Sequence, residues 1–283
     1  GFEPIKYAHV APIQKMEGDS KRKISKRKDP EANVEYYMLE GYPVESVREY
    51  LLTVANSNFE EWRKQNPDRS NEDFVVSLDK MSKSGALFDM PKLNDVSKNV
   101  ISKFTADYVY DLAYEWAERY DKEFAEIMKN HKDYTLKIMS IERGTPKPRK
   151  DIAKWNDIKS TYFYFYKELF NPQKVEDYGF DLTKFNLDDI KEICSRYASV
   201  YTQETDKQVW FDKIKHLATD IGFADDMKAY KANPANFKGH YGDVSTILRV
   251  ALTTKTNTPD LFEIMNLLGK DEVVSRLQKV CKL

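Results

Sequence analysis

The chain has 283 residues, a formal net charge of −1 and 41% apolar residues. A protein that binds nucleic acid over its whole surface would be more basic, so any such contact has to use local patches. No run of about 18 apolar residues occurs, which excludes an ordinary membrane-spanning helix. The length suits about two domains. Gly1 stands where an initiator Met would be, and it indicates a piece cut from a longer protein.

Cysteine and histidine show no metal-binding pattern. Cys194 and Cys281 lie far apart without a C-x-x-C partner, as expected for free thiols in a reducing compartment. The four histidines fall in no zinc-type spacing. No metal site is therefore expected.

The first third of the chain is predicted to mix short strands with helices. Residues 6–13 (KYAHVAPI) and 72–78 (EDFVVSL) are the best strand candidates, and the polar stretch 14–20 is predicted to be a loop. A helix is predicted from Pro43, and another from Thr105 with a pattern that runs on towards residue 127.

The rest of the chain follows a helical period. A stripe of apolar residues from Trp210 is predicted to end at Gly222. Thr258 is predicted to cap a helix that starts at Pro259 and stops at Gly269, with one more helix after it. Residues 140–155 are predicted to join two helical units, and these apolar stripes are expected to form core.

Two short stretches match one motif. Residues 80–84 read KMSKS, and residues 23–27 read KISKR, the same pattern with two substitutions. The pattern marks a mobile loop in enzymes that activate amino acids with ATP, where lysines meet charge developing on phosphoryl oxygens. Residues 21–28 hold six basic residues and no acid, whereas Asp79 and Asp89 flank the other stretch. Although a basic octapeptide is by itself more often a solvated surface, the comparison favours 23–27 as the phosphate loop.

Further segments resemble a known family. The loop is followed by the turn Glu40-Gly41-Tyr42-Pro43 and by Tyr50-Leu51-Leu52 in a predicted helix. The blocks at 80–101 (KMSKSGALFDMPKLNDVSKNVI), 241–253 and 258–277 come next in order. Together these segments resemble the bacterial-type glutamyl-tRNA synthetases of class I. Helical stripes instead of β-barrel strands favour the bacterial type within that family.

The resemblance implies roles for the loop. Lys26 is expected to meet ATP phosphates, with Lys23 and Arg27 in support, and Ser25 is expected to position the loop. Lys80–Ser84 belongs to a block that contacts the tRNA stem in the family, so it is not expected to be the ATP loop. ATP, with Mg²⁺, is the cofactor implied for the full-length enzyme, and none is expected to bind this piece tightly.

The resemblance also implies what the piece lacks. No HIGH-like motif occurs, so the chain is interpreted as the carboxyl-terminal portion of a glutamate–tRNA ligase without most of its catalytic domain, inactive alone. The implied partners are tRNA(Glu), with tRNA(Gln) left open, and glutamate and ATP through the missing domain. A cytoplasmic monomer without membrane contact is expected. The alternative is a stand-alone helical tRNA-binding module without ligase activity.

The fold class expected is mainly α, with minor β content in a stem-contact region and a two-part all-helical anticodon-binding body after it. The predicted parts are the end of the catalytic domain (1–30), the stem-contact region (31–104) and two helical subdomains (105–195 and 196–283).

One further basic patch is a candidate RNA contact. RGTPKPRK contains no acid, and its cations could neutralise RNA phosphates. A solvated linker is the alternative interpretation. The candidate residues are Arg143, Lys147, Arg149 and Lys150.

Overall fold

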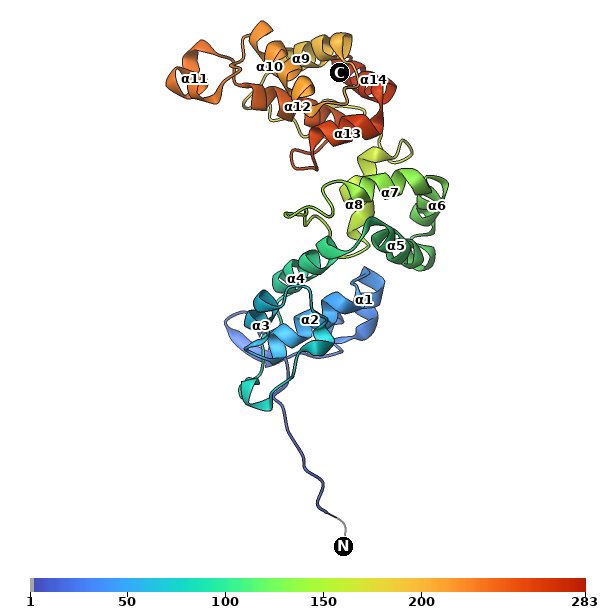
Figure 1. Ribbon diagram of the computed structural model, residues 1–283, viewed down its shortest axis with the longest axis vertical. Coiled ribbons are helices and arrows are strands. Elements are labelled where there is room, and N and C mark those ends of the chain that lie inside the picture. Colours follow the sequence, from blue (N-terminus) through green and yellow to red (C-terminus); the bar gives the residue numbers. More distant parts are fainter. Residues whose placement is uncertain (1–2) are drawn as a thin grey trace. The chain divides into compact units, whose positions relative to one another are not determined.

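The computed structural model describes residues 3–283, in two compact units (Figure 1). Unit 1 comprises Gly1–Asn130 and Arg143–Thr161, and unit 2 comprises His131–Glu142 and Tyr162–Leu283. Fourteen α-helices and one two-stranded sheet make up most of the regular structure in residues 3–283. The prediction of a mainly helical fold with minor β content is confirmed. The inference drawn from Gly1 lies outside the described residues.

Unit 1 combines a small hairpin with helices. Strands β1 (Gln14–Glu17) and β2 (Ser20–Lys23) pair antiparallel, with Gln14 opposite Lys23 and Gly18 at φ +60° in the turn. The helical elements that follow are η1 (Pro30–Ala32), α1 (Val34–Glu40), α2 (Val44–Ala55), α3 (Phe59–Gln65), η2 (Asn71–Asp73), η3 (Leu78–Lys80), α4 (Met90–Lys103), α5 (Ala106–Tyr120) and α6 (Lys122–Asn130). Helix α8 (Asp157–Tyr162) begins in unit 1 and ends one residue beyond it.

The predicted helices of unit 1 are present, with one correction. The helix expected from Pro43 is α2, and the helix expected from Thr105 is α5, whose first turn is capped by the Thr105 hydroxyl. The pattern does not continue through residue 127 as one helix. Helix α5 ends at Tyr120. The next residue, Asp121, accepts the Phe124 N–H with its Oδ1 at 3.1 Å, and this bond caps the start of α6. Local side-chain capping therefore overrides the apolar repeat.

The two strand predictions were wrong. Residues 6–13 carry no assigned strand, and residues 72–78 contain the end of η2 and the start of η3 around buried Phe74. The hairpin instead occupies the stretch predicted as a loop. A long-range partner explains it, because the Gln14 N–H donates to Ala86 O at 2.8 Å and the Phe88 N–H donates to Gln14 O at 2.7 Å. Local sequence patterns do not reveal such a partner.

A small aromatic cluster holds α2 and α4 together. Tyr42, Tyr50, Phe88 and Leu93 are buried in contact with one another. The Tyr50 hydroxyl accepts the Asp89 N–H at 2.7 Å, and the Tyr42 hydroxyl donates to an Asn94 side-chain oxygen at 2.6 Å. These bonds satisfy the polar ends of buried rings, so the aromatic positions near the family-like blocks at 40–52 and 88–93 serve the packing of unit 1.

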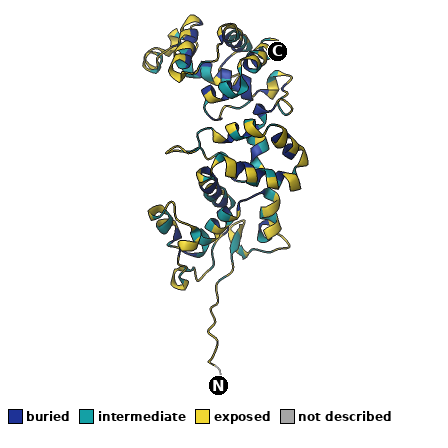
Figure 2. Cartoon of the chain, turned by 45° about the vertical axis from the view of Figure 1, so that its right-hand side comes forward, coloured by how far each residue is buried: buried dark blue, intermediate teal, exposed yellow. Residues whose placement is uncertain are grey.

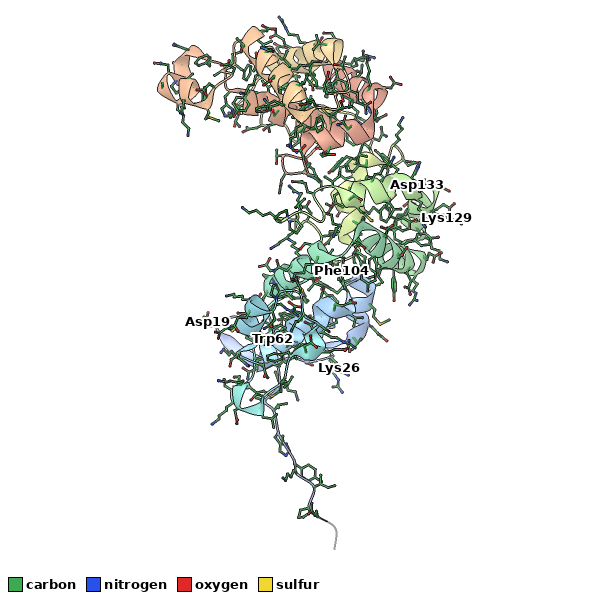
Figure 3. The ribbon with its side chains drawn as sticks, viewed as in Figure 1. Asp19, Lys26, Trp62, Phe104, Lys129 and Asp133 are labelled. Atoms are coloured by element: carbon green, nitrogen blue, oxygen red, sulfur yellow. The ribbon has the colours of Figure 1, made fainter. Side chains whose placement is uncertain are left out.

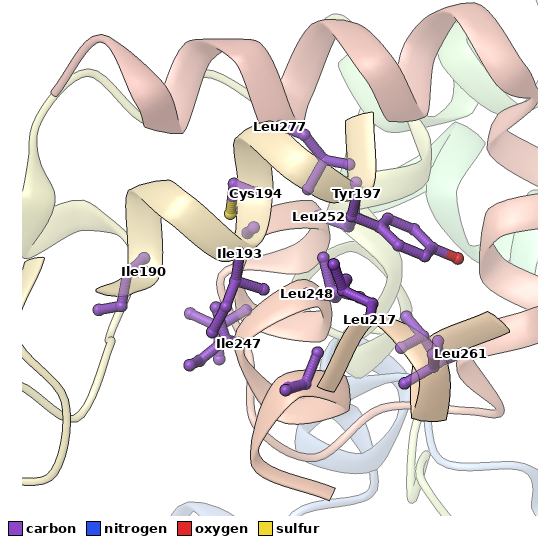
Figure 4. Packing of buried hydrophobic residues seen from close by; sticks show 14 of the residues in the cluster. Ile190, Ile193, Cys194, Tyr197, Leu217, Ile247, Leu248, Leu252, Leu261 and Leu277 are labelled. Carbon is purple, nitrogen blue, oxygen red and sulfur yellow. The ribbon is translucent and has the colours of Figure 1, made fainter. Parts of the chain in front are cut away.

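Unit 2 is helical throughout its described core. Figure 4 shows Leu277 of α14 close to Cys194 and Tyr197 of α9. Aliphatic side chains from α9, α10, α12 and α14 fill the core. Its elements are α7 (Lys132–Ser140), η4 (Phe163–Phe165), η5 (Val175–Asp177), α9 (Leu187–Val200), α10 (Lys207–Asp220), α11 (Met227–Ala232), η6 (Pro234–Asn236), α12 (Tyr241–Thr253), α13 (Leu261–Leu268) and α14 (Lys270–Cys281).

The helix ends of unit 2 match the sequence except at one cap. Gly222, at φ +82°, follows α10 as predicted, and Gly269 separates α13 from α14. The prediction of Thr258 as an N-cap was wrong. Helix α13 is capped by Asp260, whose carboxylate accepts the Glu263 N–H at 3.3 Å, whereas the buried Thr258 hydroxyl accepts a bond from Arg249. No helix within residues 3–283 combines the length and apolarity needed to cross a bilayer.

Candidate phosphate-binding loop

Residues 23–27 form a turn that leaves the hairpin at the end of β2. The Ser25 carbonyl accepts the N–H groups of Lys28 at 3.0 Å and Asp29 at 2.8 Å. The Ser25 hydroxyl accepts the Arg27 N–H at 3.4 Å. Ser25 therefore accepts three hydrogen bonds, and Lys26 and Arg27 lie at the exposed tip of the turn.

The buried carboxylate of Asp29 holds this turn in place. Its side chain is only 2% exposed. It accepts two parallel bonds from the Arg22 guanidinium at 2.6 and 2.7 Å and one from the Ser25 N–H at 2.8 Å. Lys15 lies 3.7 Å away and also pairs with Glu31. A bidentate arginine pair is directional as well as attractive, so the carboxylate fixes both ends of the loop.

The anchor gives a pH-dependent prediction. The Arg22 bonds, followed by the Ser25 N–H, hold the pKa of Asp29 well below its ordinary value. A lowered folded-state pKa contributes stability that is present above the unfolded pKa of about 3.9 and is lost as pH falls below it. Asp29→Asn should therefore destabilise unit 1 in urea unfolding at pH 7, and the difference from the unsubstituted chain should shrink steadily below about pH 4.

The control for this prediction is Asp19→Asn, in the hairpin turn. Asp19 is exposed and forms no ion pair within residues 3–283. Its substitution should leave the urea midpoint of unfolding unchanged both at pH 7 and at pH 3. An Asp29→Asn effect that stays constant down to pH 3 would contradict the anchoring role of the charged carboxylate.

The remaining cations of the loop are not neutralised. Lys23, Lys26 and Arg27 are exposed, and the structure of residues 3–283 shows no ion pair for any of them. Figure 3 shows the Lys26 side chain at the surface of unit 1. Arg22 is one of the six basic residues of 21–28, but its charge is paired with Asp29. The Arg22–Asp29 pair was missed because a basic run conceals which member pairs with a carboxylate seven residues away.

The loop borders a groove of about 830 Å³ in unit 1. Lys23, Ile24, Ser25 and Lys26 line it together with residues of α1 and α2. The lining is mostly aliphatic and aromatic and contains one acid. An anion beside Lys23 and Lys26 would therefore be attracted by their ammonium groups and repelled by few carboxylates. Glu31, the one carboxylate in the lining, is paired with Lys15. The predicted loop residues thus lie together at the edge of a concave surface.

The literal KMSKS stretch has a different setting. The Lys80 carbonyl accepts the Ser57 N–H at 3.1 Å, and the Ser82 hydroxyl lies 3.2 Å from both Ser84 Oγ and Gly85 O. Lys80 and Lys83 are exposed, as the loop lysines are, but residues 80–84 do not line the groove. Exposure does not distinguish the two motifs, whereas position relative to the groove does.

The four candidate RNA contacts do not form a uniform basic patch. The Arg143 guanidinium donates to Ile101 O at 2.7 Å and Phe104 O at 3.0 Å, which satisfies carbonyls at the end of α4. Arg149 forms a two-bond pair with Asp151 at 2.6 and 2.8 Å. Lys147 and Lys150 are exposed. Contact of these residues with RNA stays a prediction, and the two lysines have the more accessible charges.

Known proteins resemble the chain over its whole length. It is 48% identical over 283 residues to a glutamate–tRNA ligase of Clostridium perfringens (strain SM101), covering 100% of this chain and 51% of the relative. It is 45% identical to the glutamate–tRNA ligase of Acetivibrio thermocellus, covering 99% of this chain and 50% of that protein. The chain therefore spans about half the length of the curated relatives it matches.

The fold is similar to a solved structure as well. A crystal structure of glutamate-tRNA synthetase from Elizabethkingia anophelis matches with a TM-score of 0.63 at 18% identity, over 100% of this chain and 52% of that one. The model of the family described as anticodon binding domain matches residues 109–281, which is more than half of the chain. The chain therefore belongs to the anticodon-binding-domain family.

Proposed function

We propose that the chain is the tRNA-handling, carboxyl-terminal part of a glutamate–tRNA ligase, an enzyme that attaches glutamate to tRNA with ATP. The observation that carries the proposal is the 48% identity to such a ligase along the entire chain. The anticodon-binding-domain match and the unpaired cationic loop support it. The chain alone is not expected to aminoacylate. In this proposal the full-length protein is a cytoplasmic monomer that makes no contact with a membrane.

The loop fits the phosphates of ATP by its chemistry. ATP, when bound by the full-length enzyme, would supply the adenylyl group that activates the glutamate carboxylate, with pyrophosphate as the leaving group, and Mg²⁺ is expected with it. Lys26 would contact the phosphates, with Lys23 and Arg27 beside it. Ser25 and Asp29 hold the turn that presents these cations. Fixed ammonium groups stabilise charge that grows on phosphoryl oxygens as pyrophosphate leaves.

Binding of tRNA gives the direct test. The chain should retain tRNA(Glu) in a filter-binding titration at low salt, with an affinity in the micromolar range or weaker. The affinity should fall as salt rises, because lysine–phosphate contacts release counterions. Each phosphate contact removed should reduce the slope of log K against log salt by about 1, so Lys147→Ala with Lys150→Ala should reduce it by about 2.

One control variant sharpens this test. Arg149→Ala, at a guanidinium already paired with Asp151, should change the salt slope less than the double lysine variant does. No retention of tRNA at low salt would contradict the proposed function.

Comparison of tRNA(Glu) with tRNA(Gln) in full-length charging assays decides which tRNA is a substrate. The stand-alone tRNA-binding module shares the binding but predicts no effect of loop variants on ATP chemistry.

A further inference from the structure

Two polar side-chain atoms in the core of unit 2 lack a hydrogen-bond partner within residues 3–283. They are Nη2 of Arg276, on α14, and the hydroxyl oxygen of Tyr178, the residue that follows η5. Arg276 is 3% exposed and Tyr178 is 1% exposed, and Figure 2 shows the buried segments of unit 2 in dark blue. Buried polar groups in folded proteins are nearly always hydrogen-bonded, so two exceptions in one core indicate a further partner.

The other contacts of the Arg276 guanidinium fix the direction of Nη2. Its Nε donates to Glu272 at 2.7 Å, and its Nη1 donates to two backbone carbonyls. The guanidinium carbon lies 3.7 Å from the centroid of the Phe170 ring. Because the guanidinium group is planar, these contacts fix its plane, and the two N–H groups of Nη2 point within that plane. An acceptor at a defined position would therefore satisfy them.

The Tyr178 hydroxyl lies close to this cation without bonding to it. Tyr178 packs in the same cluster of buried residues as Leu277, the neighbour of Arg276 in α14. Burial raises the pKa of Tyr178 to about 12, and the positive charge of Arg276 opposes that rise. If the hydroxyl could bond directly to Nη2, each atom would be the partner of the other, which neither is. Two polar groups that are close but not in direct contact are the usual setting for a bridging molecule.

We propose that one buried water molecule binds between Nη2 of Arg276 and the Tyr178 hydroxyl and links η5 to α14. The water oxygen accepts a bond from Nη2. The water also bonds to the hydroxyl, which can donate or accept. Buried waters in other proteins typically make about three hydrogen bonds to polar groups that have no other partner. The site lies in the core of unit 2, so it is independent of the proposed function.

Charge favours water over a small anion at this position. The Arg276 cation is already paired with Glu272, which also lies 3.1 Å from Lys167. An anion at Nη2 would be repelled by the Glu272 carboxylate on the same guanidinium, and it would lose its own hydration on entering the core. Water is neutral and satisfies the same N–H groups without either cost.

Tyr178→Phe tests the water bridge, because a hydrated site and a dry site predict effects of opposite sign. If water binds, the variant removes one of its partners, and the equilibrium constant for unfolding in urea should rise about three- to tenfold. If the hydroxyl has no partner at all, its removal relieves a buried polar group, and the constant should fall. A constant that is unchanged or smaller would overturn the proposal.

A count of long-lived waters gives a second readout. Oxygen-17 relaxation dispersion should detect one long-lived water fewer in Tyr178→Phe than in the unsubstituted chain. Tyr197→Phe is the matched control, because Tyr197 is 2% exposed in the same core but its hydroxyl donates to Met265 Sδ at 3.6 Å. The control should leave the count unchanged. No loss in Tyr178→Phe, or an equal loss in both variants, would contradict the bridge.

A high-resolution crystal structure identifies the occupant. An oxygen peak about 2.7–3.2 Å from both Nη2 of Arg276 and the Tyr178 hydroxyl would support the proposal. Crystals soaked in bromide separate water from an anion, because only bromide gives an anomalous signal there. Such a signal would assign the site to an anion and reject the water. A direct hydrogen bond between the two side chains would reject it as well.

Discussion

Lys26→Ala in the full-length protein should lower the rate of ATP–pyrophosphate exchange by about 10²–10³-fold, the loss typical of one group that stabilises transition-state charge. Lys83→Ala, in the literal KMSKS stretch, should stay within about threefold, because it removes an exposed cation that does not line the groove. Both substitutions remove one lysine from a motif of the same type. The ratio of the two effects therefore tests position and not composition.

The physical reason lies in what surrounds Lys26. Its turn is fixed by bonds to Ser25 and Asp29, and its own ammonium group is unpaired in residues 3–283. A cation that no carboxylate neutralises can stabilise the charge that develops beside it. If Lys26 acts on the transition state, kcat for exchange should fall more than the KM for ATP rises.

A conservative variant controls for structural damage. Lys26→Arg keeps the charge but changes its shape, so it should recover part of the activity lost in Lys26→Ala. Circular dichroism and the urea midpoint should be the same for all three variants, since Lys26 is exposed. Equal losses for Lys26→Ala and Lys83→Ala, or a larger loss for Lys83→Ala, would contradict the assignment of the loop.

The helices were largely predictable because each carries its own signals. The stripe along α10 and the glycine after it, or the Thr105 cap of α5, depend on residues within one or two turns. The hairpin was not predictable, because β1 depends on Ala86 and Phe88, about seventy residues away in the chain. Residues 6–13 show the converse, since a clear strand pattern yields no strand without a partner.

The candidate site was predictable in its residues but not in its support. Composition alone indicated that residues 21–28, around the 23–27 loop, are richer in basic residues than 80–84. It could not show that Arg22 is withdrawn from that set by Asp29, or that Arg143 and Arg149 are engaged by carbonyls and by Asp151. Such pairings depend on the three-dimensional neighbours of each guanidinium, which a basic run does not encode.

Arg276→Met should destabilise unit 2 by about 3–5 kcal/mol, the usual result of removing one partner from a buried ion pair. Arg276 is only 3% exposed. Its Nε donates to Glu272 at 2.7 Å, and Nη1 donates to Tyr164 O at 2.7 Å and Leu252 O at 2.6 Å. Its guanidinium carbon lies 3.7 Å from the Phe170 ring centroid. One side chain therefore connects η4, α12 and α14.

The expected loss of stability in Arg276→Met follows from the buried groups that lose their hydrogen-bond partner. Burial lowers the pKa of Arg276 while Glu272 opposes the shift, and the group remains a cation because the ordinary pKa of arginine is above 12. Without it, two carbonyls lose their donor inside the unit, each at a cost of about 1–3 kcal/mol. Glu272 keeps only Lys167, at 3.1 Å. These terms overlap, so their sum sets an upper limit and not the expected value.

Arg196 provides the matched control, since it also pairs with a glutamate four residues earlier in a helix. The Arg196–Glu192 pair is exposed on both sides, so Arg196→Met should change the unfolding free energy by less than about 0.5 kcal/mol. Urea unfolding followed at Trp210, the one tryptophan of unit 2, measures both variants. Added salt should weaken the small Arg196 effect and leave the Arg276 effect nearly unchanged, because screening acts on exposed charges. A loss below 1 kcal/mol for Arg276→Met would mean that water, and not this guanidinium, satisfies the carbonyls between α12 and α14.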